Sequence, residues 1–228
     1  LSSGAKVYIC SRKVEACDLA AEKLSQEFGG ECISIPADLS NMEGIENLVK
    51  EITNKESQLD ILINNAGTAW GAPIDEYPEM GWDKVMDTNV KGVFFLTQKL
   101  LPLLRTSGSH ENPSRVVNIG SIEGIIKGSF DNFAYGPSKA ALHHLTRVLA
   151  ASLIKENIIV NAIAPGPFPT WMLSTGVGFG GKTDIDWGVV GKHNPSGRVG
   201  NMEDIAGLAI FLCSRASSYT VGQTITCD

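Results

Sequence analysis

The sequence lacks the features of proteins that bind nucleic acid or associate with membranes. It has no block of lysine and arginine, and a net charge of -6 at neutral pH disfavours binding to nucleic acid or to an anionic membrane surface. No apolar run approaches the ~20 residues that a membrane-spanning helix needs. We therefore expect neither nucleic acid nor membrane as a partner.

Metal-ligand spacing is also absent. Five cysteines are scattered along the chain, and their number is odd. We expect them to be free thiols in a reducing compartment, and with no signal peptide this predicts a cytoplasmic protein. His143 and His144 are adjacent, so they point to different faces of a helix, and no carboxylate is placed beside them. We predict no metal site. The cysteines are Cys10, Cys17, Cys32, Cys213 and Cys227.

The sequence does contain short apolar runs that alternate with longer, helix-periodic segments. Short strands that are apolar throughout predict a parallel sheet covered on both faces. We expect one α/β domain over residues 1–228, built on a doubly wound, Rossmann-like parallel sheet. The predicted strands cover residues 5–10, 32–35, 59–64, 115–119, 158–163 and 223–226. The predicted helices cover residues 14–28, 41–53, 79–105, 135–156 and 204–213.

Local chemistry predicts several boundaries. Gly29-Gly30 should end the first helix, and Ser40 should cap the second, with Glu43 completing a capping box. Pro102 should bend or shorten the helix over 79–105. Pro137 is tolerated only in a first turn, which places the start of its helix near Ala134 or Tyr135.

Polar and glycine motifs follow most of the predicted strands. Ligands of a doubly wound sheet bind beyond the carboxyl ends of its strands, so these motifs share one region. They are Ser11-Arg12, Asp38, Asn65-Ala66-Gly67, Ser121 and Pro165-Gly166.

Tyr135 and Lys139 lie four residues apart at the start of a helix. Their side chains should rise from one face, one turn apart. A phenol beside an ammonium group can donate a proton near neutral pH. Many helices carry such a pair by chance, and the spacing alone favours that reading.

Five strings in order resemble the classical short-chain dehydrogenase/reductase family and reverse that reading. The resemblance extends from the first residues to the last, and within the family it is greatest to bacterial-type 3-oxoacyl reductases, including the one linked to rhamnolipid synthesis. The five strings are Asn64-Asn65-Ala66-Gly67, Asn89, Ser121, Tyr135-x-x-x-Lys139 and Pro165-Gly166.

The resemblance implies that a hydride from NADPH reduces a ketone, with a 3-oxoacyl compound or a similar carbonyl as the small-molecule substrate. Tyr135 would donate the proton, and Lys139 would lower the phenol pKa from about 10 toward 7 and hold the cofactor ribose. Ser121 would bond the carbonyl oxygen, and Asn89 would support a water that connects Lys139 to solvent. Alternatively, Ser121 caps a strand end and Asn89 bonds backbone within a bent helix.

The cofactor is expected to be NADP(H). At the end of the second strand of the dinucleotide-binding plan the chain has Ser11-Arg12-Lys13 and no carboxylate, and a guanidinium suits a 2′-phosphate. Alternatively, Arg12 is a solvated loop charge. The full set of residues that the resemblance implies for the cofactor is Ser11, Arg12, Asp38, Leu39, Asn65, Ala66, Gly67, Tyr135, Lys139, Pro165, Gly166 and Thr170.

The chain departs from the family pattern at its ends. It begins at Leu1 rather than Met, and the family's phosphate turn, Thr-Gly-x-x-x-Gly-x-Gly, and the strand before it are not in the sequence. We expect a chain trimmed at both ends, with the loss of a central strand exposing two hydrogen-bonding edges.

Substrate selection and assembly also follow from the resemblance. The glycine-rich segment 174–197 should be a mobile substrate loop or lid beside Trp70, Glu123, Phe168 and Trp171. The resemblance implies a homotetramer or dimer joined partly through helices 79–105 and 134–156. The rival functions are an NAD-dependent alcohol dehydrogenase and a non-catalytic dinucleotide-binding scaffold.

Overall fold

Parallel strands with helices on both faces form the fold. A computed structural model describes residues 1–128, 131–174 and 185–228. Within them, β1 (Val7–Ile9) and β2 (Cys32–Ser34) form one parallel sheet. A second parallel sheet has the order β3 (Ile61–Asn64), β4 (Ser114–Ile119), β5 (Ile158–Pro165) and β6 (Thr224–Cys227). The α/β class is confirmed, although the strands are divided between two sheets.

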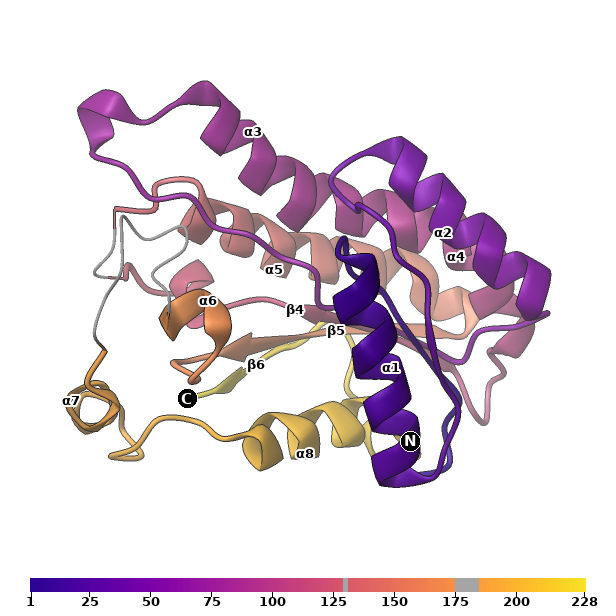
Figure 1. Cartoon of the computed structure of the whole chain (residues 1–228). Helices are drawn as coiled ribbons and strands as arrows, with labels where there is room; N and C mark the ends of the chain where they lie inside the picture. The colour runs from indigo at the N-terminus through magenta and orange to yellow at the C-terminus, as the bar shows by residue number, and fades with distance from the viewer. Residues whose placement is uncertain (129–130, 175–184) are drawn as a thin grey trace.

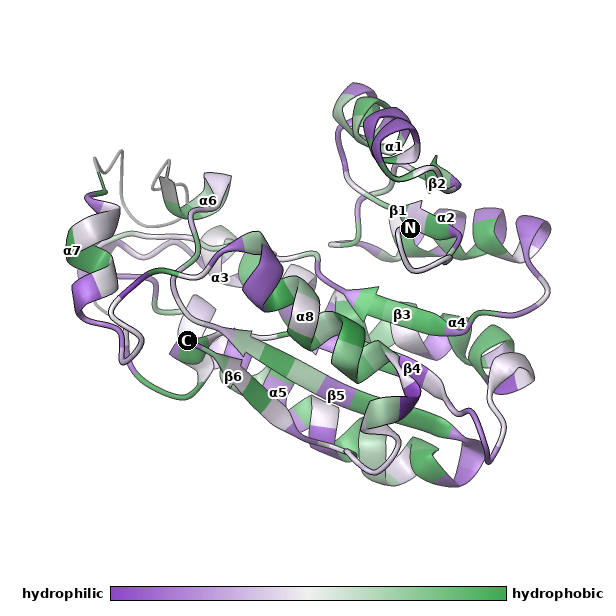
Figure 2. Ribbon diagram, turned by 90° about the horizontal axis from the view of Figure 1, so that it is seen from below, coloured by the Kyte–Doolittle hydropathy of each residue, from purple (hydrophilic) through white to green (hydrophobic). Residues whose placement is uncertain are grey.

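Helices cover both faces of the larger sheet. Figure 1 shows α4 and α5 on one face and α8 on the other, and Figure 2 shows α8 across the sheet from below. No helix in the described part of the chain is both long and apolar enough to cross a membrane. The helices are α1 (Val14–Phe28), α2 (Met42–Lys55), α3 (Glu79–Met86), α4 (Gly92–Ser107), α5 (Tyr135–Leu153), α6 (Trp171–Ser174), α7 (Trp187–Lys192) and α8 (Met202–Cys213). The short elements are η1 (Ile74–Glu76), the π turn η2 (Asp87–Lys91), η3 (Ile122–Gly124), η4 (Ile154–Glu156) and η5 (Arg215–Ser217).

The core follows from the alternation of side chains along each strand. Val116 of β4 packs with Leu100 of α4 on one face, and Val117 packs with Leu212 of α8 on the other. The cluster of buried residues on the α4 side also contains Ile35, which follows β2. This cluster therefore holds the two sheets together.

Two predicted helix boundaries are confirmed. Helix α1 ends at Gly29, which has the left-handed φ of 67° that favours glycine. Helix α5 begins at Tyr135, so Pro137 lies in its first turn, where its missing N–H removes no helical hydrogen bond.

The predicted cap of α2 is wrong. Asn41 is the cap, and its Oδ1 accepts a hydrogen bond from Gly44 N at 2.9 Å. Ser40 instead donates its hydroxyl to Asp38 at 2.8 Å. Both residue types are good caps, and the contact with Asp38 decides between them.

Two further expectations need correction. Of the two effects expected of Pro102, shortening is wrong, because α4 continues through Pro102 to Ser107, and bending stays a prediction. The glycine-rich segment is not a loop throughout, because α7 forms after Asp186, whose side chain accepts hydrogen bonds from Gly188 N and Val189 N. Residues 175–184 of that expected loop lie outside the described residues.

Candidate active site

Ser121, Tyr135 and Lys139 meet at the carboxyl end of β4. The hydroxyl groups of Ser121 and Tyr135 share a hydrogen bond. Lys139 Nζ donates to the Ile119 carbonyl at 2.8 Å and lies 5.6 Å from the centre of the Tyr135 ring. Ser121 also caps η3, since its Oγ accepts a hydrogen bond from Glu123 N at 3.2 Å. The cap and the contact with Tyr135 therefore coexist in one serine.

The pKa of Tyr135 departs in the opposite direction from the one expected. Burial raises the pKa of Tyr135, the hydrogen bond from Ser121 opposes this, and the Glu123 carboxylate adds to the rise. Burial also lowers the pKa of Lys139 to about 8. The Lys139 ammonium lies against the face of the ring and donates to a carbonyl, and its charge does not outweigh the effect of burial on the phenol pKa.

Asn89 lies fully buried in η2, the wide turn between α3 and α4. Its Oδ1 accepts from Thr68 N, and its Nδ2 donates to Thr68 O and to Ser138 Oγ, each at 2.9 Å. These contacts agree with the alternative of an asparagine that bonds backbone within a distorted helix. They tie the segment after β3 to α5, and a water held by Asn89 stays a prediction.

A cavity of about 190 Å³ lies between the ends of the two sheets. It brings together six residues predicted for the cofactor: Ser11, Arg12, Asp38, Leu39, Ala66 and Gly67. The sequence reasoning missed four others that line it: Cys10, Ala37, Thr68 and Thr88. Two of these could have been predicted from the sequence, because Thr68 directly follows Asn65-Ala66-Gly67 and Thr88 directly precedes Asn89.

The charges around this cavity are set by Asp38 and Arg12. Asp38 accepts hydrogen bonds from Ser40 N at 3.0 Å and Ser40 Oγ at 2.8 Å. The bond from the Ser40 N–H is the main reason that the pKa of Asp38 is lowered, with Arg12 and Lys84 contributing by charge. Arg12 is exposed, so its guanidinium is available to an anionic ligand.

Comparison with known proteins identifies the family. A family model described as enoyl-(acyl carrier protein) reductase matches residues 1–228. A rhamnolipid-biosynthesis 3-oxoacyl-[acyl-carrier-protein] reductase of Pseudomonas aeruginosa is 47% identical over 228 residues, which is 100% of this chain and 87% of that relative. The chain belongs to the short-chain dehydrogenase/reductase family.

Other members of the short-chain family agree in sequence and in structure. A tropinone reductase homologue of Arabidopsis thaliana is 38% identical and covers 99% of this chain and 82% of its own length. The Pseudomonas aeruginosa RhlG/NADP active-site complex has a TM-score of 0.91 and 46% identity, covering 100% of this chain and 86% of that one. A gluconate 5-dehydrogenase of Burkholderia cenocepacia, in complex with NADP and tartrate, has a TM-score of 0.85 and 27% identity over 98% of this chain and 84% of its own.

Some positions that the short-chain family resemblance implied lie outside the cavity. They are Asn65, Tyr135, Lys139, Pro165, Gly166 and Thr170. Gly166 follows β5, bonds Cys227 O through its N–H at 2.9 Å and lies against the Asp228 carboxylate. Thr170 caps the start of α6, because its Oγ accepts from Leu173 N at 3.4 Å. Their contact with a cofactor stays a prediction.

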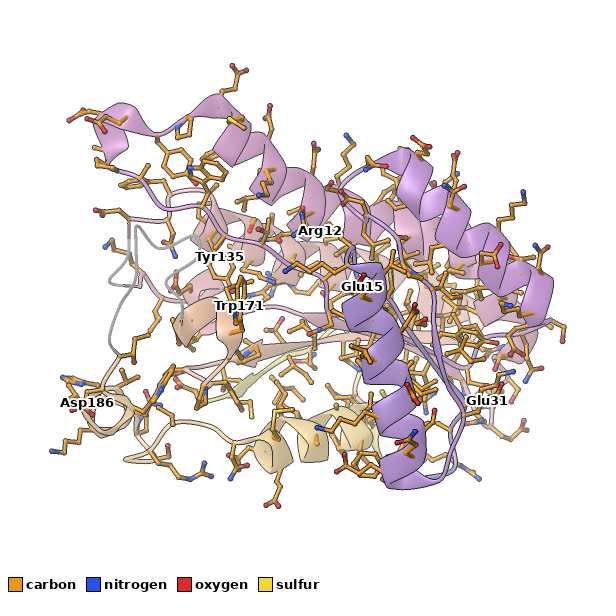
Figure 3. The ribbon with its side chains drawn as sticks, viewed as in Figure 1. Arg12, Glu15, Glu31, Tyr135, Trp171 and Asp186 are labelled. Carbon is orange, nitrogen blue, oxygen red and sulfur yellow. The ribbon has the colours of Figure 1, made fainter. Side chains whose placement is uncertain are left out.

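The residues expected around the substrate lie in different parts of the structure. Figure 3 labels Tyr135, Trp171 and Arg12, and Lys13 Nζ lies 5.9 Å from the centre of the Trp171 ring, so α6 approaches the start of α1. Glu123 accepts a hydrogen bond from Asn132 Nδ2 at 2.8 Å, and burial raises its pKa. Trp70 is turned toward α3, where it packs against Gly81.

Proposed function

We propose that this chain is an NADP(H)-dependent carbonyl reductase whose substrate is a 3-oxoacyl thioester. The observation that carries the proposal is the Ser121–Tyr135 hydrogen bond with Lys139 against the same ring. The relative at 47% identity supports the substrate class by its name, and the NADP complex of RhlG supports the cofactor. The finer substrate assignment, including the length of the acyl chain, belongs to the proposal.

The residues of the cavity fit NADP(H). Arg12 offers a fork of N–H donors to the 2′-phosphate, and Asp38, the carboxylate that lines the same cavity, accepts two hydrogen bonds from Ser40. Gly67 keeps space above Lys139, because a Cβ at this position would lie 3.4 Å from Nζ and 3.5 Å from Asn89 Oδ1. That space suits a ribose whose hydroxyl groups accept from Lys139.

The mechanism assigns one task to each residue. When bound, the cofactor supplies a hydride to the carbonyl carbon of the substrate. Ser121 holds the carbonyl oxygen beside Tyr135, and the Tyr135 hydroxyl gives its proton to the oxygen as negative charge develops there. The tyrosinate left behind lies next to the Lys139 ammonium, whose charge favours it. The raised pKa of Tyr135 keeps the phenol protonated before the reaction.

Replacing Tyr135 by phenylalanine tests this function. We expect Tyr135→Phe to lose on the order of a hundredfold or more in kcat, since general acid catalysis contributes about 10²–10⁴-fold. The measurement is NADPH oxidation with a 3-oxoacyl thioester, and NADPH binding, followed by its fluorescence, should be retained. Equal turnover by both proteins would contradict the role of the tyrosine. If no ketone is reduced by either, a non-catalytic scaffold becomes the better description.

Assembly and location complete the proposal. The family resemblance supports a homotetramer or dimer that uses helices 79–105 and 134–156, and Val148 of α5 leaves 48% of its surface exposed. All five cysteines are free, which suits the reducing cytoplasm. Light scattering of the purified protein measures the subunit number.

A further inference from the structure

His143 lies buried directly behind the catalytic serine. It follows Lys139 by one turn of α5, and only 4% of its surface is exposed. Its Nε2 accepts a hydrogen bond from the backbone N–H of Ser121 at 3.4 Å. The residue therefore contacts the backbone of the serine whose hydroxyl bonds Tyr135, and the mechanism above gives it no task.

Two glycines shape a slot for the imidazole ring. A Cβ at Gly120 would overlap His143 Nε2 and lie 2.6 Å from Cδ2, and a Cβ at Gly124 would lie 2.7 Å from Cε1. These glycines precede and follow Ser121, so the ring packs against the backbone on both sides of it. A side chain at either position would displace the ring, the serine or both.

We propose that His143 is a positioning residue for the reductase reaction, fixing Ser121 through its backbone N–H, and that it acts only as the neutral imidazole. This rests on the proposed function. A neutral ring nitrogen without its proton accepts a hydrogen bond, whereas the imidazolium has only donors. Protonation would set Nε2–H against the Ser121 N–H and push the serine away from Tyr135.

The surroundings of His143 favour the neutral form. Burial lowers its pKa most, followed by the positive charges of Lys139 and Arg147 on the same helix. Of the packed elements, β5 carries no titratable residue, and β4 carries only Arg115, near its opposite end. Elements η2 and α3 also pack on α5, and none of their charged residues is among the charges that act on the ring: Asp87, Lys91, Glu79, Asp83 and Lys84. Element η3 carries Glu123, whose carboxylate bonds Asn132. Cations thus act on the ring, and it should be protonated only in acid.

Kinetics of two variants test the proposal. His143→Leu fills the slot without an acceptor, and we expect kcat to fall on the order of tenfold while the KM for NADPH is unchanged. His143→Gln can place an amide oxygen near the position of Nε2 and does not titrate. The His143→Gln variant should keep most of kcat. Its kcat should also fall less at acidic pH, because the titration of His143 no longer contributes to the acid limb of the pH profile. The exposed neighbour supplies the control, since His144→Leu should leave the profile unchanged.

A second measurement does not depend on catalysis. The chain has four histidines, so ¹⁵N spectra of labelled protein can be assigned by comparison with His143→Gln. We expect an Nε2 without a proton at neutral pH and a pKa below the ordinary value of about 6.5. A protonated Nε2, an undiminished kcat in a folded His143→Leu, or an acid limb retained in His143→Gln would each overturn the proposal. If no thioester is turned over, only the reductase function fails, and the spectra still decide the state of the ring.

Discussion

Glu123 and Tyr135 are coupled by charge, and their coupling should be visible in the pH dependence of the reaction. The Glu123 carboxylate raises the pKa of Tyr135, because a negative charge nearby disfavours the tyrosinate. Reduction needs the protonated phenol, so activity is lost as pH rises through the pKa of Tyr135. Glu123→Gln removes the negative charge and should lower that pKa. We therefore expect the basic limb of kcat/KM to move to lower pH.

The measurement is kcat/KM for a 3-oxoacyl thioester over the basic pH range. Glu111→Gln makes the same change of charge at an exposed site near the opposite end of β4, and its profile should match the parent protein. A basic limb that moves equally in both variants, or in neither, would contradict the coupling of Glu123 with Tyr135.

At the residue scale, identity was more predictable than contact. The order and spacing of the motifs predicted that Ser121, Tyr135 and Lys139 would meet. The direction in which Lys139 Nζ points could not be predicted from the spacing. Lys139 Nζ donates to the Ile119 carbonyl, and this contact changes the effect expected on the pKa of Tyr135. The hydrogen-bond partners of Asn89 could not be predicted either, because Thr68 and Ser138 come close to that residue only in the folded chain.

At the scale of elements, the start of α4 is held against the segment around Leu39, which lines the cavity proposed for NADP(H). A Cβ at Gly92 would overlap the Leu39 carbonyl and lie 3.1 Å from Asp87 O. Gly92→Ala should therefore push α4 away from the segment around Leu39. We expect a loss of about 1–3 kcal/mol of stability, the usual effect of overpacking, together with weaker NADPH binding. Denaturant unfolding and a fluorescence titration with NADPH measure the two effects.

Gly207 provides the matched control, because it is also a helical glycine. A Cβ at this position of α8 would meet nothing within 4 Å. Gly207→Ala should raise stability by roughly 0.5–1 kcal/mol, since alanine restricts the unfolded chain and favours the helix. If both variants changed stability in the same direction, the contact between Gly92 and Leu39 would not be the cause.

Element boundaries were predictable where one residue decides them. Gly29 ends α1 through its backbone conformation, and Pro137 restricts the start of α5, so both boundaries agree with the sequence. Ser40 and Asn41 are both good caps, and a contact with Asp38 from outside the helix selects Asn41. The π turn at Asn89 depends on the same kind of distant contact, with Thr68 and Ser138.

For the whole molecule, the cavity proposed for NADP(H) joins the two sheets. Cys10, Ser11, Arg12, Ala37, Asp38 and Leu39 line it from the side of β1 and β2, and Ala66, Gly67, Thr68 and Thr88 line it from the side of β3 and η2. Apart from this cavity, the smaller sheet is attached through the core that Ile35 shares with Leu100 and through α2, which packs on α4. A ligand that contacts both walls should therefore strengthen the attachment of the smaller sheet.

NADPH should slow hydrogen exchange most strongly in β1 and β2. Their amides open when the smaller sheet detaches, whereas those of β5, in the middle of the buried core, open only on global unfolding. Arg12→Asp replaces the cation proposed to bind the 2′-phosphate by an anion, so we expect the Kd for NADPH to rise about ten- to a hundredfold. At a fixed NADPH concentration the variant should then lose the added protection of β1 and β2. NADH, which has no 2′-phosphate, should protect the variant at least as well as the parent, because a carboxylate can accept a hydrogen bond from the ribose 2′-OH. Protection that persisted in Arg12→Asp would show that the cavity does not hold the 2′-phosphate, and protection that rose equally in β5 would show that the two sheets open as one unit.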